Sequence, residues 1–322
     1  MEYSTIKNIY PVDEKSGGVS YGNAIDAALI TTELTGGLRT KKYYKKDLPD
    51  KPLITIITCV LNGEKYIEET ILSVLYQTYD NVEYLIIDGG STDSTVDIIR
   101  KYEQYVDFWI SERDKGLYDA LAKGISLSSG SICGYINAGD LYHRTALTIV
   151  SEALKIEGIE WITGLRVKYN EVSDIADVTN PLIYESRLIR AGVYGKFLPY
   201  IQQESTFWKA KLNKEVNWEC LRTLKFAGDY YLWHAFAKRH KLFVVNAMLG
   251  GFRKHSGQLT ERLSAYRAEI ETFRDKMKPG DFIRLVFHGL LWCCLSEYLR
   301  KHFTKCVHYS FSKKKWMYGV GK

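Results

Sequence analysis

Four short, mostly apolar runs, each about the length of a strand, recur in the first half of the chain. They cover residues 53–61, 83–88, 108–110 and 132–136. The first reads LITIITCVL, and such a continuous β-branched run is typical of a parallel strand covered on both faces. Turns, and stretches with apolar residues at helical spacing, separate the runs. This alternation predicts right-handed βαβ units and an α/β fold with a doubly wound, mostly parallel sheet.

The stretch between the third and fourth runs leads to an acidic residue at a strand end. Residues 117–125 place apolar or small side chains at i, i+3, i+4, i+7 and i+8, which predicts a helix with one packed face. Gly130 breaks the pattern, and the strand over 132–136 then runs into the sequence INAGD, which ends at Asp140. Ligands of open α/β sheets gather just beyond the carboxyl ends of the strands. Asp140 is therefore predicted to lie where the chemistry is done.

The rest of the chain carries weaker patterns. Residues 145–154 predict a helix, residues 161–169 alternate loosely like an edge or antiparallel strand, and residues 242–248 predict another strand. Residues 170–200 are rich in loop signals and predict no clear element. The expected divisions are an N-terminal arm and linker over 1–51, a main domain over 52–260 with halves 52–140 and 141–260, and a C-terminal helical, basic-aromatic region over 261–322.

Composition describes an ordinary globular chain. It has 322 residues, 46% apolar and 25% charged, with a net charge of +6. No compact basic motif interleaved with aromatics indicates nucleic acid as a partner. The six cysteines show neither a CxxC pair nor metal-finger spacing, and the N-terminus lacks the apolar core of a signal peptide. We therefore expect a reduced, cytoplasmic protein.

The C-terminal region allows two interpretations. Residues 285–295 are apolar but fall short of the ~20 residues that span a bilayer. After Glu297 there is no acidic residue, and seven Lys or Arg residues alternate with aromatic ones. Such a segment suits the anionic inner surface of a plasma membrane, and equally a packed helix followed by a solvated basic tail.

Two phosphate-binding classes are disfavoured. No GxGxxG follows the first predicted strand, and no GxxxxGK[ST] occurs anywhere, which argues against a dinucleotide-binding Rossmann domain and a P-loop NTPase. A bound diphosphate would then need a metal ion held by a hard oxygen ligand such as Asp140.

The motifs, taken together and in order, resemble a known family. The N-terminal half contains ITIITCVLN, ETILSVLYQTY, EYLIIDGGSTDST, SERDKGLYDALAKGI and INAGD, and the C-terminal half contains QQESTFWK, FAGDYYLW and FRKHSG. Over roughly residues 52–260 they are similar to an inverting family-2 glycosyltransferase of the GT-A fold, in the branch that builds bacterial surface polysaccharides. The resemblance implies a nucleotide-binding half over 52–140 and an acceptor-binding half over 141–260.

The resemblance also implies site residues. Those on the nucleotide-sugar side are Cys59 (through its backbone), Asn62, Asp88, Asp114 and Lys123. Those on the acceptor side are Gln203, Glu204 and Trp208. A Mg²⁺ or Mn²⁺ ion on the diphosphate would be held by Asp140 and His255, and Asp229 occupies the position of the catalytic base.

Each assignment has a structural alternative. Asp229 and Asp140 could each cap a following helix, and Asp88 could be a turn residue that binds the Gly89–Gly90 backbone. His255 could be a surface residue, and the acceptor-side residues could simply pack the domain. The chain also has Gly89, Gly139 and Gly228 where family members often have a second carboxylate.

The implied function is a single displacement. The sugar of a nucleotide-diphosphate donor, with a UDP-sugar favoured, would move to a hydroxyl of a growing, lipid-linked polysaccharide. The base takes the acceptor proton and the metal stabilises the leaving diphosphate, so no covalent intermediate is needed. The alternatives are a nucleotidyltransferase, which would want a Gly-rich signature near the first strand, and a non-catalytic binding or scaffold subunit.

Overall fold

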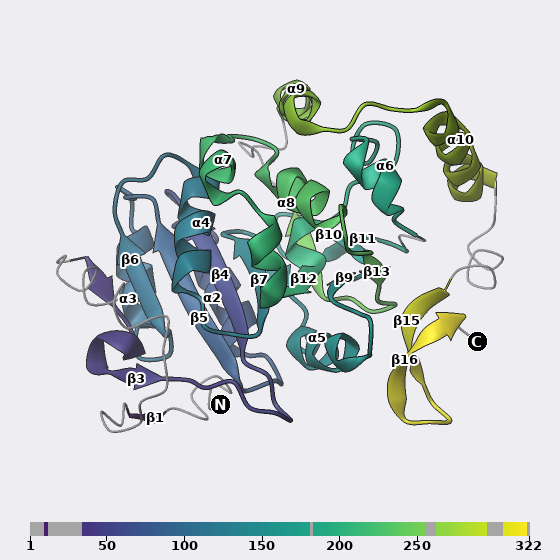
Figure 1. The fold of residues 1–322 in the computed structure, drawn as a ribbon. Coiled ribbons are helices and arrows are strands. Elements are labelled where there is room, and N and C mark those ends of the chain that lie inside the picture. Colours follow the sequence, from purple (N-terminus) through teal and green to yellow (C-terminus); the bar gives the residue numbers. More distant parts are fainter. Residues whose placement is uncertain (1–9, 12–33, 181–182, 255–261, 295–304, 321–322) are drawn as a thin grey trace.

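An eight-stranded sheet forms the centre of the protein (Figure 1). The computed structural model describes residues 10–11, 34–180, 183–254, 262–294 and 305–320. The strand order is β13-β9-β12-β7-β4-β5-β6-β2. The bounds are β2 Thr35–Gly36, β4 Ile54–Val60, β5 Val82–Asp88, β6 Phe108–Ser111, β7 Ile132–Asn137, β9 Trp161–Thr163, β12 Thr206–Lys209 and β13 Phe243–Val244. The four strands predicted from the apolar runs, β4 to β7, pair in parallel, so this part of the prediction is confirmed.

Helices cover both faces of the sheet, which explains the continuous apolar runs. Every residue of β4 and β5 is buried. One face packs against α4 (Leu117–Leu127), α6 (Ser186–Arg190), α7 (Trp218–Thr223) and α8 (Gly228–Phe236). The other face packs against α2 (Ile67–Leu75), α3 (Thr95–Lys101) and α5 (Ala146–Lys155). Because parallel strands end at the same edge, the loops after β4, β5, β6 and β7 lie together.

A second, four-stranded sheet has the order β11-β10-β14-β8. Its strands are β8 Leu141–Tyr142, β10 Arg166–Tyr169, β11 Ile175–Thr179 and β14 Gly250–Arg253. The single strand expected over residues 161–169 is in fact two strands, β9 and β10, in different sheets. Residues 170–200, which predicted no element, contain β11 and α6. By pairing with β8, β14 brings the segment just before His255 next to Asp140.

Residues 34–51 belong to the sheet domain, although they fall within the predicted N-terminal arm and linker over 1–51. β2 pairs antiparallel with β6, and the 3₁₀ helix η2 (Leu38–Lys41) and β3 (Tyr43–Tyr44) follow; β3 also pairs with β1 (Tyr10–Pro11). Arg39 and Lys45 are buried, and each finds a buried carboxylate: Arg39 binds Glu83, and the Lys45 amine lies 2.7 Å from Asp107. These two buried ion pairs join the segment to the sheet, and the composition of the segment gives no sign of them.

We expect Arg39→Met to destabilise the fold by about 3–5 kcal/mol, because Glu83 would keep a buried charge without its cation. Urea unfolding of Arg39→Met and of Lys41→Met, an exposed neighbour on η2, measures this. The Lys41 variant should stay within about 0.5 kcal/mol of the wild type. Equal midpoints for both variants would show that the Arg39–Glu83 pair does not anchor the segment.

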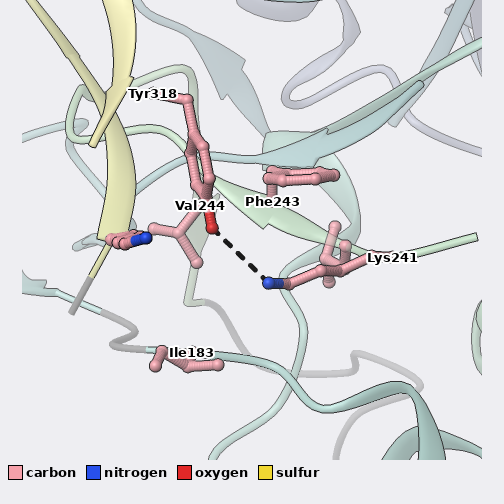
Figure 2. A pocket seen from close by; sticks show the side chains of 7 residues that line it. Ile183, Lys241, Phe243, Val244 and Tyr318 are labelled. Atoms are coloured by element: carbon pink, nitrogen blue, oxygen red, sulfur yellow. Dashed lines mark hydrogen bonds between the residues drawn. The ribbon is translucent and has the colours of Figure 1, made fainter. Parts of the chain in front are cut away.

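The C-terminal region contains more than helices. After α9 (Leu263–Phe273) and α10 (Pro279–Cys294), β15 (Lys305–Ser310) and β16 (Lys315–Val320) form an antiparallel hairpin. The hairpin docks beside β13, where the rings of Phe243 and Tyr318 meet edge to face at 5.1 Å. Figure 2 shows the Lys241 amine beside the Tyr318 hydroxyl, 3.5 Å away, at a cavity of about 230 Å³. In the described ranges, no helix combines the length and apolar character needed to cross a bilayer.

Candidate active site

The predicted site residues of the N-terminal half do gather at the carboxyl edge of the parallel strands. Asp88 ends β5, Asp114 follows β6 and Asp140 follows β7. The Asp114 carboxylate lies against the backbone of Gly89, where an added Cβ would be 2.7 Å from Oδ2. Asp114 is half-buried, and burial raises its pKa, opposed by the N–H of Gly116, which donates at 2.8 Å. The Asp114 carboxyl group therefore lies between the loop after β5 and the loop after β6.

Asp88 shapes the loop from inside. Its side chain is fully buried, and Oδ2 accepts from the Gly90 and Ser91 N–H groups at 3.1 and 2.9 Å and from the Ser111 hydroxyl at 2.5 Å. Oδ1 accepts from the Ser91 hydroxyl. Both oxygens accept hydrogen bonds within the chain, as expected of the turn residue that is the structural alternative for Asp88.

Asn62 ties the loop after β4 to the loop after β5. It has a positive φ of 51°, its N–H donates to Ser91 Oγ at 2.7 Å, and its Oδ1 accepts the N–H of Thr92 at 2.9 Å. The Cys59 thiol is buried, and burial raises its pKa, so the expected contact of Cys59 with a nucleotide would be made by its backbone. Lys123, on α4, is half-buried and its amine binds Glu112.

Asp140 is buried and held by the second sheet. Its Oδ1 accepts the N–H of Arg253 at 3.0 Å, and its carbonyl accepts from Thr70 at 2.9 Å. Burial raises the pKa of Asp140 to about 7, against the lowering effect of the Arg253 backbone N–H and charge. The next helix, α5, starts after Thr145, so Asp140 does not cap it. The capping alternative is thereby removed.

The three acceptor-side residues have different environments. Gln203 is buried and bonded on both sides, donating to the Tyr135 carbonyl and accepting from Asn137 at 3.0 Å. Glu204 is also buried, and its Oε1 finds no hydrogen-bond partner among the described residues. Burial raises the pKa of Glu204 well above its usual value, and the charges of Asp140 and Asp229 add to this. The negative charges of both aspartates therefore act on the Glu204 carboxyl group.

Trp208 is a core residue, which is the packing role left open as the alternative for the acceptor-side residues. Its side chain is fully buried, and its indole N–H donates to Asn213 Oδ1 at 2.7 Å. Its ring packs on Trp233 and Phe236 of α8, at 6.0 and 5.6 Å between centroids. No part of the side chain is left to contact a substrate.

Asp229 lies in the first turn of α8, where the N-cap is Ala227, so the capping alternative does not hold here either. The carboxyl group accepts from the Tyr266 hydroxyl at 3.3 Å. Burial raises the pKa of Asp229 to about 7; hydrogen bonds from the Tyr230 N–H, Tyr266 and Tyr118 limit the rise. A carboxyl group with this pKa changes protonation near neutral pH, as a general base must.

Three residues that support Asp229 were missed by the sequence analysis. The Tyr118 hydroxyl donates to the Phe226 carbonyl at 2.9 Å, and Glu269 accepts from the N–H groups of Lys225, Phe226 and Ala227 at 2.9, 2.8 and 2.6 Å. Glu269 and Tyr266 belong to α9, beyond the recognised motifs. Tyr118 stands inside one of them, SERDKGLYDALAKGI, but no spacing rule could pair it with residue 229.

The three glycines that depart from the family pattern have steric causes. Gly139 has a φ of +113°, which a side chain rarely adopts. A Cβ at Gly228 would be 2.4 Å from the Tyr118 ring, and one at Gly89 would meet Asp114. A side chain would therefore crowd a neighbouring group at Gly89 and Gly228 and would strain the backbone at Gly139.

The described residues contain no complete set of metal ligands. Among them, no group of three or more His, Cys, Asp or Glu side chains could hold a metal ion. His255 lies outside the described residues. Mg²⁺ is often held by one or two carboxylates together with substrate phosphates. Asp140 is buried, and its charge raises the pKa of Glu204, whose Oε1 has no hydrogen-bond partner among the described residues; these two carboxyl groups fit an ion that arrives with a diphosphate.

Comparison with known proteins identifies the family. The sequence model described as glycosyl transferase family 2 matches residues 55–217, about half of the chain. An uncharacterized glycosyltransferase of Rickettsia prowazekii (strain Madrid E) is 35% identical over 241 residues, covering 73% of this chain and 75% of the relative. The chain belongs to glycosyltransferase family 2.

Solved structures agree on the fold of this family-2 glycosyltransferase. S. aureus TarS 1–349 in complex with UDP has a TM-score of 0.50 and 16% identity, covering 78% of this chain and 69% of TarS. The mannosyltransferase PcManGT from Pyrobaculum calidifontis, in complex with GDP-Man and Mn²⁺, has a TM-score of 0.50 and 16% identity, covering 76% and 71%. The predicted GT-A fold and family are confirmed.

Proposed function

We propose that this glycosyltransferase acts by inversion, moving a sugar from a UDP-sugar to a hydroxyl of a growing, lipid-linked surface polysaccharide. The observation that carries the proposal is Asp229, a carboxyl group with a pKa of about 7 held by two tyrosines at a helix start. UDP is the nucleotide bound to TarS, which shares the fold, and this supports the choice of donor. The polysaccharide acceptor rests on the resemblance of the motifs.

The residues have separable roles in the proposed displacement. Asp229 accepts the proton of the acceptor hydroxyl. At the same time, the hydroxyl oxygen bonds to the sugar C1 and the bond between C1 and the diphosphate breaks. Asp140, with His255, would hold Mg²⁺ or Mn²⁺, which when bound neutralises the diphosphate charge. Asp114 and Lys123 face the donor, and Gln203 and Glu204 line the acceptor side. Asn62 and the backbone of Cys59, at the end of β4, line the pocket for the nucleotide.

The proposed division follows the same roles. Residues 52–140 bind the donor, and the acceptor half, from residue 141, extends past 260 into α9 because Tyr266 and Glu269 support Asp229. We place the enzyme in the cytoplasm, on the inner face of the plasma membrane.

Release of nucleoside diphosphate from UDP-, GDP- and dTDP-sugars, with Mn²⁺ or with EDTA, tests the proposal. We expect release from a UDP-sugar only, with Mn²⁺ only, and at a higher rate with lipid-linked glycans. Asp229→Ala should abolish it. Donor binding by calorimetry without release, even with lipid-linked glycans present, would contradict catalysis and favour a binding subunit.

A further inference from the structure

Helix α10 turns its apolar side chains away from the protein. They are spaced i, i+1, i+4, i+5 and i+8, which places them on one helix face. These residues, with exposed fractions of 54–74%, are Phe282, Ile283, Val286, Phe287 and Leu290. Figure 1 shows α10 at the edge of the molecule, beyond α6. A helix of a water-soluble domain normally has the opposite orientation, with the apolar face against the core.

Polar contacts hold this orientation. Asp281 and His288 are buried on the inward face. Asp281 accepts from Arg187 of α6 at 2.9 Å, and His288 Nε2 lies 3.2 Å from Glu185, at the start of the same helix. Arg284 also binds Glu185. Rotating α10 to bury its apolar face would break these pairs and would also withdraw Leu285, which packs against the core, so the outward face is built into the fold.

Positive charge follows the apolar helix. The last 25 residues, 298–322, carry seven Lys or Arg and no acidic residue, while the whole chain has a net charge of +6, so the chain before them is close to neutral. At the tip of the β15–β16 hairpin, Phe311 is 86% exposed and Lys313, Lys314 and Lys315 are exposed. In Figure 1, both elements lie on the right-hand side of the molecule, α10 above and the hairpin below.

We propose that the outward face of α10 and the hairpin tip form one docking surface for an anionic lipid bilayer. The 16-residue helix, about 24 Å long, is too short to span the ~30 Å hydrocarbon layer and lies in the interface with its apolar face down. The hairpin lysines attract anionic head groups. A second copy of the chain fits less well, because pairing would bring two basic C-termini together. The inference deepens the proposed function by naming what holds the enzyme beside a lipid-linked acceptor.

Sedimentation of the full chain with vesicles tests this without any sugar donor. We expect binding to vesicles of phosphatidylcholine with 30% phosphatidylglycerol, and weak binding to phosphatidylcholine alone. Ile283→Glu/Phe287→Glu should lower the bound fraction at least tenfold. The matched control, Val172→Glu/Phe197→Glu, adds the same charges at exposed apolar positions elsewhere and should bind like wild type after allowing for net charge.

Two further measurements separate the outcomes. Lys313→Gln/Lys314→Gln/Lys315→Gln should lose the preference for anionic vesicles. Hydrolysis of a soluble UDP-sugar should stay unchanged in the α10 variant, so a failure of vesicle binding is distinct from a failure of the proposed catalysis. Vesicle binding by the α10 variant equal to wild type would overturn the proposal. So would a concentration-dependent dimer, seen by light scattering, that this variant abolishes while vesicle binding persists.

Discussion

Asp229→Asn is expected to lower kcat by about 10³-fold while leaving the affinity for the nucleotide donor within about twofold. A positioned general base contributes about 10²–10⁴-fold, and asparagine cannot accept the acceptor proton. Asparagine is nearly isosteric and can still accept from Tyr266, so the first turn of α8 should persist. Initial rates at saturating donor, with calorimetry of donor binding, measure the two effects separately.

The pH dependence provides the signature of this role. Because burial raises the pKa of Asp229 to about 7, the base is protonated below that pH, and kcat/KM of the wild type should fall about tenfold for each unit below it. Tyr266→Phe removes a donor that favours the ionised carboxylate, so the acid limb should move to higher pH. A structural role of Tyr266 would lower activity at all pH values without moving the limb.

A matched control separates the base from the general effect of losing a carboxylate. Asp97 lies on α3, with a side chain 77% exposed, and Asp97→Asn should retain wild-type kcat and pH profile. Asp229→Asn activity within tenfold of wild type, with an unchanged acid limb, would assign the base to another residue.

Asp140→Asn is expected to lower kcat/KM by about 10²-fold or more and to weaken the dependence on Mn²⁺. Asparagine keeps the hydrogen bond from the Arg253 N–H but loses the negative charge that a divalent cation needs. Titration of activity with Mn²⁺ at fixed donor measures the change. Full activity in EDTA, in the variant or in the wild type, would remove the metal from the proposal.

The same variant has an expected effect on stability. Asp140 has a folded pKa of about 7, above the ~3.9 of an unfolded aspartate, so between these values the folded state binds more protons and its stability falls as pH rises. In metal-free buffer, Asp140→Asn should therefore be more stable than wild type at pH 8, by up to about 4 kcal/mol, and about equally stable at pH 4. Urea unfolding at the two pH values measures this and shows that the lost activity is not a loss of folding.

Local patterns were sufficient for the parallel half of the fold. The runs that form β4 and β7 are apolar because helices cover both faces of the sheet. Consecutive residues are therefore buried, and this can be recognised from the sequence alone. The place of Asp140 follows from the same pattern, since it comes directly after a buried strand. Asp229 came from the resemblance of a motif, and its support by Tyr118 and Tyr266 remained invisible because these lie 111 and 37 residues away along the chain.

The sequence by itself therefore determined the strand–helix order, the parallel sheet and the acidic residue at its edge, because each depends on spacing within a few residues. Only the tertiary structure decided what long-range contacts control. It buried Trp208 against α8, used both oxygens of Asp88 inside a loop, and paired Arg39 with Glu83. It also turned the apolar face of α10 outward through Asp281 and His288. The physical reason is the same in each case: burial and pairing depend on residues that are distant along the chain, and local sequence patterns do not identify them.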